Sequence, residues 1–216
     1  MTIDWNQIKL AIFDLDGTLI NSLDANLSIL NEIRIEKKMP KIFPHDLKPL
    51  LSHGAPLMAK TFFPEDNPAE ITKIFRDKYS AYSTSENSIY DGAREFLQSL
   101  LKLEINLAVC SNKPFNLCNK VLEDVKLNNF FSLVIGGDTL PEKKPSSYVL
   151  KNILDFFQAS AKETIFFGDS EIDKLFADSL GVLYAHHESG YENLKNDKDN
   201  LIFSYAEISK SLCSSL

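Results

Sequence analysis

The sequence predicts an α/β protein in which a parallel sheet carries helices on both faces and an all-helical segment is inserted near the start. Two observations lead to this prediction. Short apolar segments alternate with helical segments from about residue 88 onward, whereas residues 20–87 contain helical segments without a convincing strand. We therefore expect a core domain made of residues 1–19 and 88–216, and a helical domain made of residues 20–87.

The expected strands are short apolar segments that resemble strands buried on both faces of a sheet. They are rich in β-branched or aromatic residues and lie close to Gly, Ser or Asn. The segments are 8–14, 105–111, 131–138, 164–170 and 181–187. His186 and His187, at the end of the last segment, are expected in a surface loop.

The expected helices of the core lie between these strands, at 91–103, 114–126, 146–157 and 171–181. Pro114 suits a first helical turn, Ser146 suits an N-cap, and Gly181 suits a helix end. The insertion contributes three further helices, at 25–38, 55–63 and 68–82.

Composition excludes several classes of protein. A chain of 216 residues that is 44% hydrophobic can build a core plus a small accessory unit. A net charge of −7 argues against nucleic acid as a partner. Since no apolar run approaches the ~20 residues of a membrane span or forms a signal-like segment, we expect a cytoplasmic protein without a membrane partner. The three cysteines, Cys110, Cys118 and Cys213, lack the spacing of a zinc site or a disulfide framework.

The first strand ends in a pair of aspartates. Residues 12–22 read IFDLDGTLINS, so Asp14 and Asp16 are one residue apart. In a continued strand both carboxylates would point to the same side and repel each other. Protonation of one, a bound metal or a turn between them would relieve this repulsion, and Gly17 directly afterwards favours a turn.

Polar side chains follow the other expected strands too. The carboxyl ends of parallel strands share one edge of a sheet, so we expect these residues to converge with the aspartate pair. Several carboxylates beside a hydroxyl and a lysine suit a hard divalent cation, most naturally Mg²⁺, together with an anionic substrate group. The residues are Ser111, Asn112, Lys143, Lys144, Asp169 and Asp173.

The strings FDLDGT, CSN, KKP and GDSEID, in this order, resemble the haloacid dehalogenase superfamily over essentially the whole chain. The resemblance implies a Rossmann-like core, and the inserted helices are similar to the helical cap of that superfamily. The segments SHGAPLMAKTF, YDGAREFLQSL, SNKP and LPEKKPS are most similar to the phosphoglycolate phosphatase branch. The resemblance therefore implies a magnesium-dependent phosphatase of small phosphorylated metabolites, with 2-phosphoglycolate as the first candidate substrate.

The resemblance also implies roles for the catalytic residues. Asp14 is expected to attack phosphorus and form an aspartyl-phosphate, while Asp16 protonates the leaving alkoxide and then activates water. Ser111 is expected to donate a hydrogen bond to a phosphoryl oxygen. Lys144 is expected to supply positive charge to the phosphate and to Asp14, with Lys143 as the alternative lysine.

The implied metal ligands are the carboxylates of Asp14 and Asp169 and the backbone carbonyl of Asp16. Asp173 is expected either to bind metal-bound waters or to hold Lys144. The turn after the first strand and the loop after the second are expected to contact the substrate, through Leu15, Gly17, Thr18 and Asn112. In the cap, His53 and Gly54 occupy the place of a substrate-contacting loop, although an ordinary helix–helix turn is an equal alternative.

Two other functions are compatible with these motifs. A sugar phosphomutase would use the same nucleophile and return the phosphoryl group to the substrate. A non-catalytic phosphate-binding domain would keep the fold, although it has little use for a nucleophile. The sequence leaves open whether the protein is a monomer or a homodimer.

Overall fold

The computed structural model describes residues 3–194 and 201–213, and within these ranges the core is a six-stranded parallel sheet. The strands are β1 (Leu10–Phe13), β2 (Asn106–Cys110), β3 (Leu133–Ile135), β4 (Thr164–Gly168), β5 (Leu183–His187) and β6 (Leu201–Phe203). Their order in the sheet is β3-β2-β1-β4-β5-β6. Because the chain leaves β1 on one side and returns on the other, the strand order reverses at β1, where sheets of this kind bind ligands.

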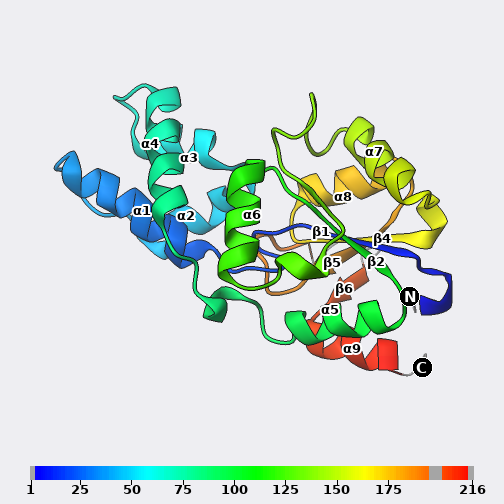
Figure 1. Cartoon of the computed structure of the whole chain (residues 1–216). Helices are drawn as coiled ribbons and strands as arrows, with labels where there is room; N and C mark the ends of the chain where they lie inside the picture. The colour runs from blue at the N-terminus through cyan, green and yellow to red at the C-terminus, as the bar shows by residue number, and fades with distance from the viewer. Residues whose placement is uncertain (1–2, 195–200, 214–216) are drawn as a thin grey trace.

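Helices cover both faces of this sheet, as the sequence predicts (Figure 1). Alternate residues of β1 point to opposite faces, so Ala11 and Phe13 belong to one apolar cluster and Leu10 and Ile12 to the other. Helices α5 (Ala93–Lys102), α6 (Phe115–Asp124) and α9 (Tyr205–Cys213) pack on the first face. Helices α7 (Ser147–Phe157) and α8 (Glu171–Asp178) pack on the second face.

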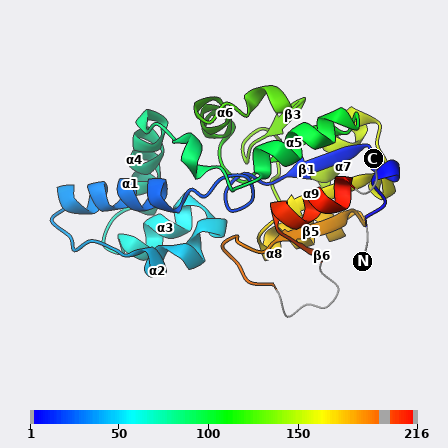
Figure 2. The same ribbon diagram turned by 90° about the horizontal axis from the view of Figure 1, so that it is seen from below.

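The inserted helices lie together at one end of the molecule, beside the carboxyl ends of the strands (Figure 2). They are α1 (Leu23–Glu36), α2 (Pro44–Leu47), α3 (Ala55–Phe62) and α4 (Pro68–Ala81), with a 3₁₀ helix at Lys48–His53. Helix α4 buries Ile71, Phe75 and Tyr79, which are four residues apart and therefore share one face. The division of the chain into a core and a cap domain stays a prediction.

Apart from short 3₁₀ helices, three of the described elements were not predicted from the sequence: α2, β6 and α9. Helix α2 spans four residues and β6 spans three, so neither is long enough to show a period. Ser146 caps α7 as predicted, since its side chain accepts a hydrogen bond from the Tyr148 amide. None of the described helices is long and apolar enough to cross a membrane.

The prediction that His186 and His187 lie in a surface loop is wrong. Both belong to β5, and they are 1% and 2% exposed. His187 is buried against three aromatic rings, those of Tyr90, Phe203 and Tyr205. The pairing of β5 with the unpredicted strand β6 explains the error, because it extends the sheet over residues that otherwise would be at its edge.

Candidate active site

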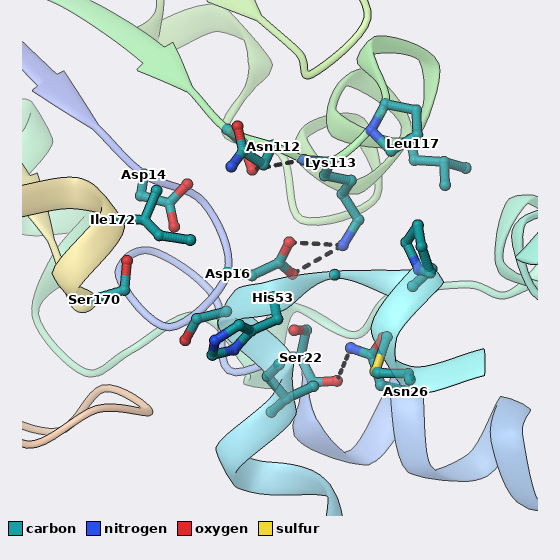
Figure 3. Close-up of a pocket in the computed structure, with 18 of the residues that line it drawn as sticks. Asp14, Asp16, Ser22, Asn26, His53, Asn112, Lys113, Leu117, Ser170 and Ile172 are labelled. Atoms are coloured by element: carbon teal, nitrogen blue, oxygen red, sulfur yellow. Dashed lines mark hydrogen bonds and ion pairs between the residues drawn. The ribbon is translucent and has the colours of Figure 1, made fainter. Parts of the chain in front are cut away.

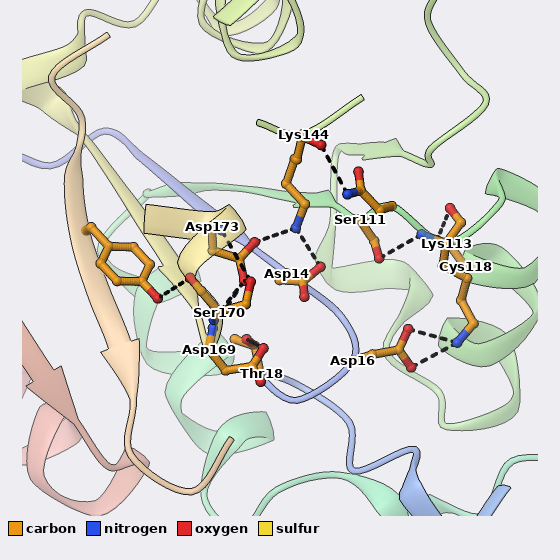
Figure 4. A network of polar contacts seen from close by, with 12 residues as sticks. Asp14, Asp16, Thr18, Ser111, Lys113, Cys118, Lys144, Asp169, Ser170 and Asp173 are labelled. Carbon is orange, nitrogen blue, oxygen red and sulfur yellow. Dashed lines mark hydrogen bonds and ion pairs between the residues drawn. The ribbon is translucent and has the colours of Figure 1, made fainter. Parts of the chain in front are cut away.

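Three buried carboxylates meet where β1 and β4 end (Figure 4). Asp14 directly follows β1, Asp169 directly follows β4, and Asp173 lies in the first turn of α8. One oxygen from each lies within 4.8 Å of the others. The structure therefore brings together three of the acids that the sequence predicts at this edge.

Lys144 is the cation of this cluster. Its Nζ lies 2.8 Å from Asp14 Oδ1 and 2.6 Å from Asp173 Oδ1, and the residue is 4% exposed. Lys143 is exposed, so the structure selects Lys144 from the two lysines that the sequence offers. The other oxygen of Asp14, Oδ2, has no hydrogen bond to a described residue and is left for a ligand.

The charge of the cluster suits a divalent cation. Three carboxylates and one ammonium leave two uncompensated negative charges in a buried site. Burial raises the pKa of Asp14, although Lys144 opposes this effect. Burial raises the pKa of Asp169 as well, and the neighbouring Asp173 and Asp14 carboxylates raise it further. Bound positive charge would relieve both effects, so these residues fit a hard cation with oxygen ligands.

Asp169 is held in place by the chain around it. Its Oδ2 accepts a hydrogen bond from the Tyr191 amide at 2.7 Å, and Thr18 Oγ1 approaches its Oδ1 at 3.4 Å. A side chain at Gly17 or at Gly190 would come within 2.2 Å of the Asp169 side chain. Gly17 also has φ +86, so this position needs glycine for both space and conformation.

Asp173 orients its neighbours. Its Oδ2 accepts hydrogen bonds from the amides of Asp169 and Ser170 and from Ser170 Oγ, while its Oδ1 accepts from Lys144. Of the two roles that the resemblance left open for Asp173, the structure shows a contact with Lys144.

The Asp16 side chain turns away from the other acids, and this turn reduces the repulsion between the two close aspartates. Both of its carboxylate oxygens accept hydrogen bonds from Lys113 Nζ at 2.8 Å (Figure 3). Lys113 also donates to Tyr79 Oη of the inserted helices at 3.1 Å. The sequence analysis missed Lys113, and the only signal for it was its place directly after Ser111 and Asn112.

Ser111 and Asn112 lie at the end of β2, next to this ion pair. Ser111 Oγ accepts a hydrogen bond from the Lys113 amide, and Asn112 Nδ2 donates to the Lys144 carbonyl. Asn112 Oδ1 is buried and has no hydrogen-bond partner among the described residues. The loops after β2 and β3 are thus tied together beside Asp14.

A cavity of about 250 Å³ opens between these core residues and the inserted helices (Figure 3). Its volume suits a ligand smaller than a typical drug. His53 and Gly54 line it, as predicted, although their role as substrate contacts stays a prediction. The inserted helices and their flanks also contribute Ser22, Asn26, Ser52, Met58, Phe75, Arg76 and Tyr79.

Two residues of the first turn that are predicted to contact the substrate have other partners in the structure, and their contacts with substrate stay predictions. The Gly17 amide donates to the Ile20 carbonyl at 2.8 Å, so this donor is already used. Thr18 is 0% exposed and approaches Asp169, which makes it a support for that carboxylate. Leu15 is also fully buried.

Tyr191 joins the site to the start of the inserted helices. Its hydroxyl accepts a hydrogen bond from the Ser22 amide at 2.7 Å and shares another with Ser22 Oγ at 3.0 Å. Ser22 directly precedes α1, and the Tyr191 amide contacts Asp169. The sequence analysis did not find this connection, because the two residues are 169 positions apart.

Comparisons with known proteins identify the class to which this fold and site belong. The family model described as haloacid dehalogenase-like hydrolase matches residues 11–186, so the chain belongs to that family. Within the family it is a phosphoric monoester hydrolase similar to phosphoglycolate phosphatases. The phosphoglycolate phosphatase of Rhodobacter capsulatus is 30% identical over 86% of this chain and 87% of its own length. That of Chromobacterium violaceum is 30% identical over 81% of this chain and 82% of its own.

Solved structures agree with this assignment. The crystal structure of a predicted phosphoglycolate phosphatase from Haemophilus somnus 129pt has a TM-score of 0.83 and 26% identity, and the match covers 94% of this chain and 97% of that one. The β-phosphoglucomutase of Clostridium difficile has a TM-score of 0.73 over 96% of this chain and 98% of its own, at 15% identity. The latter similarity shows the fold alone.

Proposed function

We propose that the protein is a magnesium-dependent phosphatase that hydrolyses a small phosphomonoester through an aspartyl-phosphate on Asp14, with 2-phosphoglycolate as the first candidate substrate. One observation carries this proposal. Asp14 presents a carboxylate oxygen without a hydrogen bond to a described residue, its other oxygen is bound by Lys144, and Asp16 lines the same 250 Å³ cavity. A phosphate-binding domain without chemistry would not need a carboxylate in that place.

In the first step, Asp14 Oδ2 forms a bond to phosphorus while the bond from phosphorus to the ester oxygen breaks. Asp16 enters this step in its protonated form and gives its proton to the leaving oxygen, which departs as an alcohol. Lys144 holds Asp14 and adds positive charge beside the phosphoryl oxygens, and Ser111 donates a hydrogen bond to one of them. Positioning and electrostatic stabilisation are most of what phosphoryl transfer requires from a protein.

In the second step, water attacks the phosphorus of the aspartyl-phosphate. Asp16 takes a proton from this water, the bond from phosphorus to Asp14 breaks, and inorganic phosphate leaves. Asp14 is then a free carboxylate and Asp16 is protonated again, so the enzyme has returned to its starting state.

The proposed metal ligands are the carboxylates of Asp14 and Asp169 with the Asp16 backbone carbonyl. A bound Mg²⁺ would neutralise negative charge on the phosphoryl oxygens. Asp173 is proposed to act through Lys144, whose Nζ it holds at 2.6 Å.

Residues 20–87 are proposed to act as a cap domain that admits substrate and then excludes water. Residues of this segment, including His53, Arg76 and Tyr79, form the wall of the cavity that faces Asp16. The hinges are proposed near Asn21 and Ser22 at one end and at 85–88 at the other. Cap residues are therefore expected to determine which substrate is used more than how fast the phosphoryl group is transferred.

The test is phosphate release from glycolate, sugar, nucleotide and amino-acid phosphates, with Mg²⁺ and with a chelator. Wild type is compared with Asp14→Asn and with the control Asp155→Asn, which changes an exposed aspartate of α7 that forms an ion pair with Lys151. Release that depends on Mg²⁺ and is lost in Asp14→Asn alone supports the proposal. Turnover of no compound contradicts it, and isomerised sugar phosphate without release of phosphate would indicate a mutase.

A further inference from the structure

We propose that Lys113 is the receptor for a carboxylate on the substrate, so that the enzyme selects phosphomonoesters with a carboxylate on the carbon next to the ester oxygen. This inference rests on the proposed function and adds a specificity-determining residue to it. It starts from the ion pair of Lys113 with Asp16 inside the cavity (Figure 3).

Lys113 is in a fixed place. Its amide donates to Ser111 Oγ, and its carbonyl accepts hydrogen bonds from the Gly137 amide at 2.8 Å and from Cys118 Sγ at 3.4 Å. Its side chain is 10% exposed, and its Nζ lies 4.3 Å from the centroid of the Tyr79 ring. A lysine held in this way loses little conformational entropy when it binds an anion.

The place of Lys113 relative to the substrate follows from the role proposed for Asp16. Since Asp16 is proposed to protonate the ester oxygen, that oxygen lies against the Asp16 carboxyl group. Lys113 Nζ lies 2.8 Å from both oxygens of the same group. A carboxylate separated from the ester oxygen by a single carbon is therefore delivered next to Lys113. It would replace one Asp16 oxygen among the acceptors of the ammonium group, which has three donors.

Burial makes this contact selective. Tyr79 covers the ammonium from the cap side, and hydrogen bonds between charged groups are stronger where water is excluded. A substrate with a neutral group at this position gains no such contact. Arg76 and Lys143 also line the cavity but are less suitable, because both are exposed and neither forms an ion pair with Asp16 among the described residues.

The test compares 2-phosphoglycolate with ethyl phosphate, in which a methyl group replaces the carboxylate. Loss of Lys113 also affects Asp16, but that effect is common to both substrates and cancels in the ratio of their kcat/KM values. We expect wild type to prefer 2-phosphoglycolate at least about tenfold, since a hydrogen bond between charged groups has at least that effect. Lys113→Met is expected to remove most of this preference, and Lys113→Arg, which keeps the charge, to retain part of it.

The control is Lys120→Met, which breaks the ion pair with Asp124 on α6 outside the cavity and is expected to keep the wild-type ratio. Equal losses for both substrates in Lys113→Met would show that Lys113 acts only through Asp16 and would overturn the inference. A wild-type ratio below about two, or a ratio that depends on Arg76→Gln and not on Lys113, would overturn it as well.

Two further measurements separate this inference from the proposed function. Hydrolysis of p-nitrophenyl phosphate with Mg²⁺ reports phosphatase activity without a carboxylate, so its absence would contradict the proposed function. Calorimetric binding of 2-phosphoglycolate and of ethyl phosphate to Asp14→Asn, with and without Lys113→Met, tests the carboxylate contact without turnover. Equal affinities for both compounds would overturn the inference even if the enzyme is active.

Discussion

Replacement of Lys144 by methionine is expected to destabilise the fold strongly in the absence of metal. Methionine keeps most of the side-chain volume, so the change removes charge without opening a cavity. It leaves Asp14, Asp169 and Asp173 within 4.8 Å of one another and removes the ammonium group that contacts Asp14 and Asp173. Removal of one partner from a buried ion pair costs about 3–5 kcal/mol.

For a chain of this length, that loss corresponds to a fall in melting temperature of about 6–20 °C. The assay is thermal unfolding followed by circular dichroism in a chelator. Lys120→Met is the matched control, because its ion pair with Asp124 is partly exposed and is expected to contribute at most about 1 kcal/mol. A loss in Lys144→Met no larger than that of the control would refute the view that Lys144 compensates the buried acids.

Three further predictions concern metal binding, the hinge and pH. Mg²⁺ is expected to raise the melting temperature of wild type and not of Asp169→Asn, because a ligand of the native state stabilises it; an equal rise in both would contradict the ligand assignment. Tyr191→Phe leaves the Ser22 amide without its acceptor and is expected to lower the free energy of unfolding in urea by about 1–3 kcal/mol; no loss would show that another acceptor replaces the hydroxyl. Burial lowers the pKa of His187 below 6.5, so the unfolded chain takes up a proton first as pH falls. The contribution of His187 to the free energy of unfolding is fully present above pH 6.5 and declines below it by up to about 1.4 kcal/mol per pH unit. His187→Gln is expected to reduce this slope, and an unchanged slope would contradict the role of His187.

The sequence predicted the architecture because the core strands are apolar on both faces and the helices between them are long enough to show a period. It predicted the convergence of Asp14, Asp169 and Asp173 because parallel strands place their carboxyl ends at one edge of the sheet. It failed at β6 and α2, which are too short for a pattern, and therefore at His186 and His187, whose burial depends on the pairing of β5 with β6.

The amino-acid sequence by itself thus determined the kind of fold, the family and the acids that gather at the end of β1. The tertiary structure decided which partner each acid has. Lys144 and not Lys143 reaches Asp14, because the loop after β3 buries only one of these two adjacent side chains against the acids. The contact of Lys113 with Asp16 joins residues that are 97 positions apart, and the contact of Tyr191 with Ser22 joins residues that are 169 positions apart. Hydrogen bonds across such separations leave no periodic signal in a sequence, since they exist only when the strands and loops that carry them are already packed together.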